Sequence, residues 1–123
     1  MMGPALFELC SGDPALQALL GTSPFRMFPA GDAPQDVSRP YVAWQTVGGA
    51  PENYLATNPD IDQHLIQVDV YSPDLAQGRA IARAIRDVVQ QRCHVTAFRG
   101  ESREVDTRLY RVSFDLTWYE PAP

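Results

Sequence analysis

One stretch near the C-terminal end of the chain, in which apolar and polar residues alternate one by one, constrains the fold more than any other feature. It covers residues 107–119, and its apolar members are Tyr110, Val112, Phe114, Leu116 and Trp118. Successive side chains of a β-strand point to opposite faces of the sheet, so this period of two predicts one buried face and one polar face. We therefore expect a central strand of an antiparallel sheet here.

Three further stretches are dense in β-branched and aromatic residues and predict additional strands. They are 40–47, 63–71 and 94–98. A brief apolar run at 25–28 lies among prolines, which predicts one short edge strand at most.

Polar stretches separate these predicted strands. Gly48 to Pro51 should end the strand at 40–47, and a connector over 49–62 should lead to the next strand. Residues 100–106 are rich in charged side chains and are expected to connect the last two strands.

A major helix is predicted between the third and fourth strands. Ser72, Pro73 and Asp74 supply a cap, a first-turn proline and an acid near the positive end of the helix dipole. Apolar residues then recur at helical spacing over 75–89, and the helix should end near Arg92. Three arginines fall outside this apolar stripe and should meet solvent or a partner: Arg79, Arg83 and Arg86.

The N-terminal segment predicts a shorter helical region over residues 4–20, in one or two pieces. Asp13 before Pro14 is typical of an N-cap followed by proline at the first helical position. Gly21 is the expected C-cap residue. The order of elements predicts an α+β fold with an antiparallel or mixed sheet of four to five strands. The N-terminal helix and the long helix should pack on one face of that sheet, in a single domain spanning residues 1–123.

The composition is that of a folded, acidic protein. Hydrophobic residues make up 45% of the 123 residues and charged residues 20%, which is enough for a real core. The net charge of −5 argues against gripping nucleic acid, but it does not exclude the wall of a channel through which DNA slides. No apolar stretch approaches the ~20 residues that span a bilayer, and no signal peptide pattern is present, so we expect synthesis in the cytoplasm without membrane contact. Cys10 and Cys93 are expected to be free thiols, and the sequence leaves open whether they ever form a bridge.

The sequence contains none of the common catalytic or cofactor-binding motifs, which predicts a protein without enzymatic activity or cofactor. One cluster carries an alternative reading. Asp60, Asp62 and His64 alternate at a strand entrance, where they can share one face and hold a divalent metal in a small hydrolase. The favoured interpretation is a strand entrance with ordinary polar residues.

Polar residues on neighbouring predicted strands also have two readings. Asp69, Arg111 and Asp115 can form a cross-strand ion pair on an exposed sheet, which we favour, or they can face another subunit or a channel. Tyr54 and Leu55 form an aromatic and aliphatic pair within a polar stretch, which is the best local indication of a partner surface.

Taken together along the chain, these segments resemble the tail completion, or tail terminator, proteins of long-tailed phages. The resemblance lies in the order and spacing of segments rather than in one motif, and it spans nearly the entire chain. Its segments are Pro4 to Phe7, Leu19 to Gly21 with Phe25 and Arg26, Pro40 to Gly49, Pro51 to Leu55, Pro59 to Asp62, Ile66 to Tyr71, the Ala/Arg-rich helix from Ser72 to Val89, and Tyr110 to Asp115.

The resemblance implies a structural protein of the virion neck. Such proteins assemble as a hexameric ring that caps the tail tube, stops its polymerisation and joins the tail to the head. The implied partners are the tail tube protein and a head-completion or stopper protein, with DNA passing through the bore without specific binding. Flexible and contractile tails both use such rings. Another neck or tube component, a head-closure stopper or a tail tube protein, is the alternative.

A ring subunit needs heterologous contacts, in which one side of each copy meets the other side of the next. We expect the two connectors to act as the arms of these contacts, since both leave the sheet at strand ends. The predicted interface residues are Glu52, Asn53, Tyr54, Leu55, Asp60, Asp62, Glu101, Arg103 and Glu104. The residues predicted for the polar sheet face or the bore are Asp69, Arg111 and Asp115.

Overall fold

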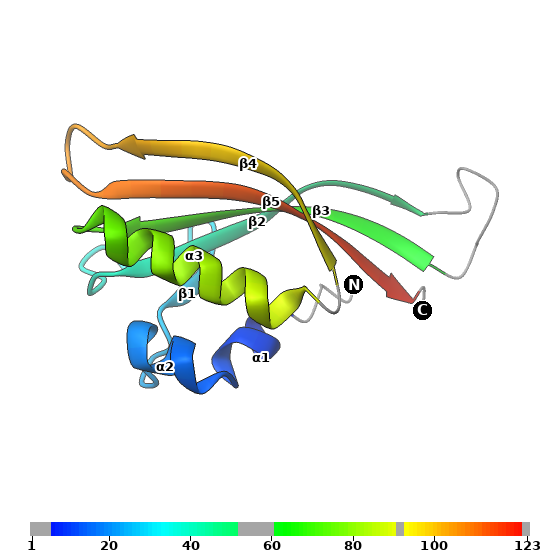
Figure 1. The fold of residues 1–123 in the computed structure, drawn as a ribbon, viewed down its shortest axis with the longest axis horizontal. Coiled ribbons are helices and arrows are strands. Elements are labelled where there is room, and N and C mark those ends of the chain that lie inside the picture. Colours follow the sequence, from blue (N-terminus) through cyan, green and yellow to red (C-terminus); the bar gives the residue numbers. More distant parts are fainter. Residues whose placement is uncertain (1–5, 52–60, 91–92, 122–123) are drawn as a thin grey trace.

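The computed structural model describes residues 6–51, 61–90 and 93–121, and it shows a sheet with helices on one face (Figure 1). The helices are α1 (Leu6–Ser11), α2 (Pro14–Leu20) and α3 (Leu75–Val89). The strands are β1 (Met27–Pro29), β2 (Tyr41–Pro51), β3 (Ile61–Ser72), β4 (Cys93–Arg103) and β5 (Tyr110–Pro121). The predicted α+β class is confirmed.

The sheet is mixed, with the strand order β1-β2-β3-β5-β4. β1 is parallel to β2, and all other neighbouring strands are antiparallel. β5 lies between β3 and β4, so the strand with the strictest alternation is central, as predicted. α3 crosses from β3 to β4 and packs on β3 and β5, while α1 and α2 contact α3 on the same side of the sheet.

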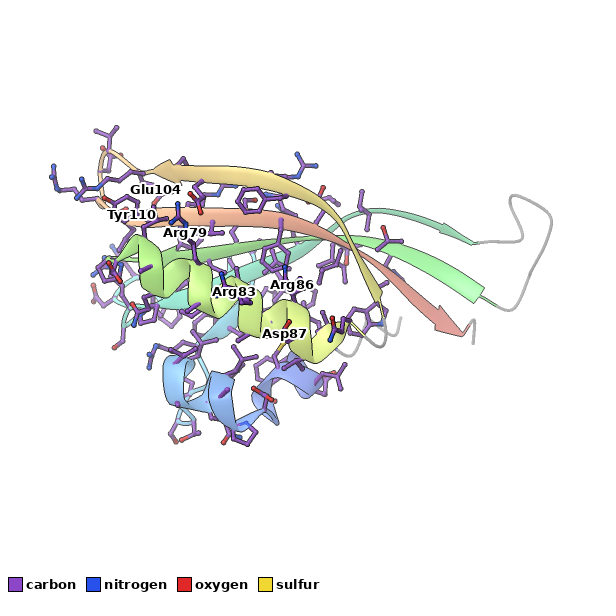
Figure 2. All side chains as sticks on the ribbon, viewed as in Figure 1. Arg79, Arg83, Arg86, Asp87, Glu104 and Tyr110 are labelled. Carbon is purple, nitrogen blue, oxygen red and sulfur yellow. The ribbon has the colours of Figure 1, made fainter. Side chains whose placement is uncertain are left out.

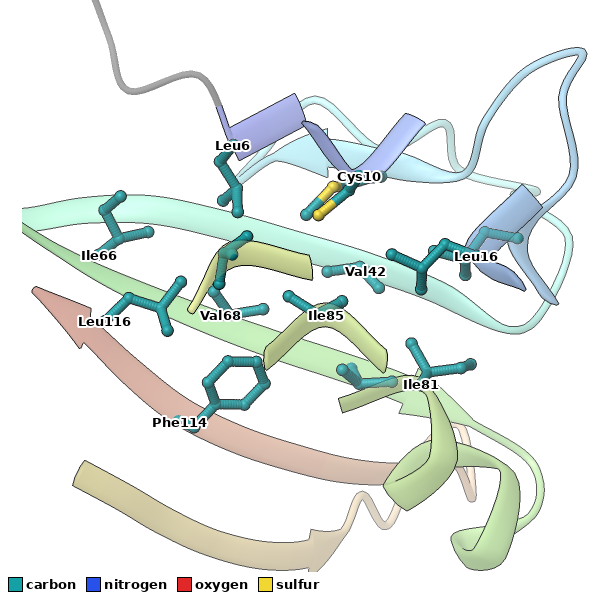
Figure 3. Packing of buried hydrophobic residues seen from close by; sticks show 14 of the residues in the cluster. Leu6, Cys10, Leu16, Val42, Ile66, Val68, Ile81, Ile85, Phe114 and Leu116 are labelled. Atoms are coloured by element: carbon teal, nitrogen blue, oxygen red, sulfur yellow. The ribbon is translucent and has the colours of Figure 1, made fainter. Parts of the chain in front are cut away.

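The core fills the space between the sheet and the helices (Figure 3). Ile81, Ile85 and Val89 of α3 are fully buried against the sheet. From β5, Val112, Phe114, Leu116 and Trp118 face the same core. Burying an aliphatic or aromatic side chain contributes about 1.5–3 kcal/mol, so the contact between α3 and β5 contributes substantially to the stability of the fold.

Gly78 sets how closely α3 approaches the sheet. A Cβ at this position would lie 3.3 Å from Val112 Cγ2 and 3.5 Å from the Cβ of Ser72. Glycine therefore lets the first turns of the helix rest almost directly on β5 and on the end of β3.

The helix ends follow the predicted capping chemistry with one correction. Asp13 accepts a hydrogen bond from the Leu16 amide at 3.1 Å, and Gly21 closes α2 with φ 83°. At α3, however, the N-cap is Asp74, whose carboxylate accepts from the Gln77 amide at 3.0 Å. Ser72 instead ends β3, and its hydroxyl accepts from the Asp74 amide at 3.1 Å. α3 ends at Val89, before the predicted end near Arg92.

Two strands are longer than the sequence predicted. β2 continues through Gly48 to Pro51 because these residues pair with β3 beyond a bulge between Thr46 and Gly48. Residues 49–51 and 61–62 of the predicted connector 49–62 are therefore strand. β4 likewise continues to Arg103 beyond two register shifts, one of which lies between Phe98 and Gly100. The expected connector 100–106 is strand in its first half.

The sheet extends further than its helical cover. In Figure 1, β2, β3 and β5 run past the end of α3, so that Pro51 and Ile61 lie at a projecting end of the sheet. The turn between β4 and β5 lies at the opposite end.

Candidate functional site

The predicted interface residues fall into two groups at opposite ends of the sheet. Glu52, Asn53, Tyr54, Leu55 and Asp60 lie outside the described residues. Asp62 lies within β3, where its register partners are Pro51 of β2 and Glu120 of β5. Glu101 and Arg103 belong to β4, and Glu104 opens the turn that leads to β5. The prediction that Asp62, Glu101 and Arg103 stand in connectors was therefore wrong.

The turn between β4 and β5 is held together by its own side chains. Arg103 lies over the ring of Tyr110, with its guanidinium carbon 5.0 Å from the ring centre. The Glu104 carboxylate accepts a hydrogen bond from the Thr107 hydroxyl at 2.9 Å. Val105 at the tip is 90% exposed. This end of the sheet thus presents one apolar side chain on a turn with a defined shape.

The polar face of the sheet carries a network centred on Asp69. Its carboxylate accepts hydrogen bonds from Ser113 Oγ at 2.6 Å and from Arg111 Nη2 at 3.3 Å. Gln67 Nε2 also lies 3.3 Å from both carboxylate oxygens. Arg111 Nε is 3.3 Å from Asp69 Oδ1, but it is buried without an aligned hydrogen-bond acceptor among the described residues. The favoured reading of a cross-strand ion pair is confirmed for Asp69 and Arg111.

Arg111 keeps its charge in this half-buried position. Burial lowers the pKa of Arg111, but the hydrogen bond and the negative charge of Asp69 outweigh that effect and raise its pKa above the ordinary value. Asp69 is only 7% exposed, so the ion pair does not stand on an open sheet surface as the sequence suggested.

Asp115 has a partner that the sequence did not reveal. Arg99 Nε donates to Asp115 Oδ1 at 2.7 Å, and Asp115 itself is 5% exposed. Arg99 is the extra residue of the register shift between Phe98 and Gly100, and Gly100 has φ 122°. A bulge of this kind changes the direction in which a side chain points. Arg99 lies outside the strand predicted at 94–98. The alternation of polar and apolar residues therefore did not indicate that it pairs with Asp115.

Two tyrosines extend the same face toward the turn end. Tyr41 and Tyr71 are register partners, and their rings stack with centroids 4.9 Å apart. Burial raises the pKa of both phenols above the ordinary value. Tyr71 is also the register partner of Arg111, so the stacked tyrosines lie beside the Asp69 network.

A groove opens on the other face, between α3 and β4. Its volume is about 220 Å³, and it is lined by Arg79, Ala82, Arg83, Arg86, Phe98, Val112 and Phe114. Phe98 is 63% exposed although it belongs to the helix-covered face, because α3 packs on β3 and β5 and leaves β4 uncovered. We call this the α3–β4 groove. The sequence predicts that Phe98 lies in a strand. Its exposure was not predictable, because it depends on where α3 packs on the sheet.

The arginines of α3 give the groove a basic rim (Figure 2). Figure 2 shows Arg79, Arg83 and Arg86 following one another along the helix. Arg79 makes a two-pronged ion pair with Glu101 of β4, at 2.6 and 2.7 Å. The hydrogen bond from Arg79 lowers the pKa of the Glu101 carboxyl. Arg86 lies 3.7 Å from Asp87, and Arg83 has no ion-pair partner within the described part of the chain.

The alternative metal site involves Asp60, Asp62 and His64. His64 is half-buried in β3, whereas Asp60 and the side chain of Asp62 lie outside the described residues. Among the side chains that are described, no group of three His, Cys, Asp or Glu could hold a metal ion. Within the same residues, no helix has the length and apolar character needed to cross a membrane.

Comparison with known proteins identifies the family of the chain. No curated protein sequence matches the chain. Among solved structures, the chain is similar to one described as "Virion of native gene transfer agent (GTA) particle", with a TM-score of 0.67 and 16% sequence identity. That match covers 95% of this chain and 92% of the other, and it shows a shared fold. The family model of the tail completion protein gp17 matches residues 4–120. The chain therefore belongs to the tail completion protein gp17 family.

Proposed function

We propose that this protein is a tail terminator, a structural protein that caps the tail tube, stops its polymerisation and joins the tail to the head. Membership of the tail completion family over residues 4–120 is the observation that carries the proposal. Family membership supports a structural role in a phage tail. The terminator role is the more specific part of the proposal. The proposed location is the neck of the virion.

The shape of the molecule supports assembly into a ring. Contacts of the heterologous kind need two different surfaces on each copy. The structure offers a projecting end of the sheet at Pro51 and Ile61 and, on the body, the α3–β4 groove. Six copies arranged in this way form the proposed hexamer, with the tail tube protein on one side and a head-completion or stopper protein on the other.

We assign the polar face of the sheet to the bore. Asp69 and Asp115 are buried and neutralised by Arg111 and Arg99 from the same chain. A wall whose charges are paired internally presents no excess positive charge to phosphate groups. DNA can therefore pass along it without specific binding.

Assembly on purified tail tubes tests this function. Added protein should bind at one end of each tube and prevent further addition of tube subunits, and electron microscopy should show a single extra ring there. A protein that remains monomeric at high concentration and in the presence of tubes contradicts the proposal. Tail tube subunits alone, without this protein, are the control for continued growth.

A second component of the same junction is the competing assignment, since a head-closure stopper or tail tube protein shares the size and acidity of this chain. Imaging of intact virions by cryo-electron microscopy separates them. A tube protein occupies many stacked rings and a terminator one. A stopper occupies the ring nearer the head.

A further inference from the structure

The α3–β4 groove is a surface for which the family membership names no occupant. Its floor is apolar and is formed by Phe98, Val112 and Phe114, while its rim is formed by arginines. Phe98 is 63% exposed, which is unusual for a large aromatic side chain on the helix-covered face of a sheet. The groove thus combines an uncovered aromatic ring with positive charge.

The positive charge of this rim is only partly neutralised. Arg79, Arg83 and Arg86 stand at spacings of four and three, so they share one side of α3. Glu101 pairs with Arg79, and Asp87 approaches Arg86 only to 3.7 Å. Arg83 has no carboxylate within ion-pair distance in the described part of the chain. An occupant should therefore bring carboxylates beside apolar side chains.

We propose that the α3–β4 groove of each copy receives the 52–60 segment of the next copy in the ring. This inference rests on the proposed ring function. The segment has the matching chemistry: Glu52 and Asp60 are acidic, and Tyr54 and Leu55 are aromatic and aliphatic. The carboxylates would pair with Arg83 and Arg86, and the apolar pair would cover Phe98.

Distance along the sheet requires that a second copy supply the segment. The groove floor at Phe114 lies opposite Val68, whereas the segment joins β3 at Ile61. At ~3.3 Å per residue this separation along β3 is about 23 Å. A segment of this length, attached at both ends, reaches at most ~17 Å from the sheet end. The 52–60 segment of the same copy therefore falls short of its own groove.

Charge reversal at the groove tests the docking. Arg83→Glu should weaken ring assembly on tail tubes about tenfold or more, because it places a carboxylate opposite the acidic segment. Arg39→Glu is the matched control, since Arg39 is exposed and lies outside the groove. Its effect should stay within about twofold. Thermal unfolding of both variants verifies that neither change disturbs the fold.

Compensating changes make the test specific. Adding Arg86→Glu, Glu52→Arg and Asp60→Arg to Arg83→Glu should restore assembly, since the charges of both groove arginines and both segment carboxylates are then exchanged. Assembly by Arg83→Glu equal to that of the wild-type protein would overturn the docking. Failure of the quadruple variant to recover would overturn it as well.

Cross-linking gives a readout independent of charge. Two single variants, Leu55→Cys and Phe98→Cys, should form a mixed disulfide when combined under oxidation, and mass spectrometry should join residue 55 of one copy to residue 98 of another. Wild-type protein treated alike controls for Cys10 and Cys93. Rings of the two mixed variants that lack this cross-link contradict the docking and leave the terminator function standing. Wild-type protein that forms no ring on tubes removes both.

Discussion

At the scale of single residues, the polar face of the sheet shows how buried carboxylates are paired. Asp69 and Asp115 each lie beside an arginine that originates from the same sheet, and both are less than a tenth exposed. Removing a carboxylate from water costs free energy unless the group is paired and hydrogen-bonded. The two ion pairs offset that cost and leave the face with little net charge.

Removing the Asp69 carboxylate should destabilise the protein. Asp69→Ala leaves the Ser113 hydroxyl and the half-buried Arg111 guanidinium without their acceptor. We expect a loss of ~2–3 kcal/mol in the free energy of unfolding, measured by urea denaturation. Ser113→Ala, which removes only one neutral donor, should cost about 1 kcal/mol. A loss for Asp69→Ala no larger than that of the control would show that the network contributes little.

The ion pair between Arg79 and Glu101 should make stability depend on pH. The folded protein holds the pKa of Glu101 below its ordinary value of 4.5. A carboxyl with a lowered pKa contributes stability that is fully present above its unfolded pKa and is lost as pH falls through the folded pKa. Wild-type protein should therefore be more stable than Glu101→Gln at neutral pH, and the difference should shrink as the pH falls through the folded pKa of Glu101. Denaturation at neutral and at acidic pH measures the difference, and a gap that persists in acid would refute this assignment.

At the scale of elements, α3 lies between the sheet and the two short helices α1 and α2. One side of the helix is buried on β3 and β5, and its other positions contact α1 and α2 or line the α3–β4 groove. β4 lies at the sheet edge, where the Arg79–Glu101 ion pair joins it to α3 across the groove, and two register shifts interrupt its pairing with β5. Bulges at an edge discourage uncontrolled pairing with other strands. The position of α3 therefore decides which part of the sheet is left for partners.

The close approach of α3 to the sheet depends on Gly78. Gly78→Val places methyl groups where the backbone now rests near Val112, so the helix must shift away from β5. We expect a loss of ~1–3 kcal/mol in the free energy of unfolding. Ala80→Val on the exposed side of the same helix should cost only ~0.7 kcal/mol, from helix propensity. Urea midpoints compare the two, and equal losses would mean that the contact at Gly78 has no packing consequence.

At the scale of the whole molecule, the compact body and the projecting part of the sheet differ in their helical cover. The core lies under α3, while β2, β3 and β5 continue past it to Pro51 and Ile61 (Figure 1). Such an extension adds surface that the chain does not cover with its own helices. In a ring, that surface is available to the neighbouring copy.

The 52–60 segment should therefore matter for assembly and not for folding. Changing both Tyr54 and Leu55 to Ser should leave the far-UV circular dichroism spectrum unchanged and weaken binding to tail tubes. The reason is that the proposed docking places these two side chains against the neighbouring copy. A large loss of secondary structure in the double variant would show that they belong to the core. Light scattering of the purified variant, compared with the wild-type protein, reports the change in assembly.

Much of the fold was predictable because it depends on residues close together in the sequence. Alternation identified β5 as the central strand, and helical spacing over 75–89 identified α3. Asp13 and Gly21 marked the ends of α2 through capping chemistry that involves only nearby backbone groups. The extent of β2 and β4 was not predictable, since glycine and proline at 48–51 and charged residues at 100–103 oppose strand formation locally. Ladder hydrogen bonds with β3 and β5 overcome that preference.

Local sequence patterns were sufficient to predict the class of fold, the central strand, the capping of α2 and the resemblance to tail completion proteins. Which charges pair and which apolar residues remain uncovered depends on the packing of distant elements. Arg99 reaches Asp115 because a bulge redirects it, and Phe98 is exposed because α3 packs on β3 and β5. Both outcomes depend on residues far apart in the chain, and local periodicity contains no information about them.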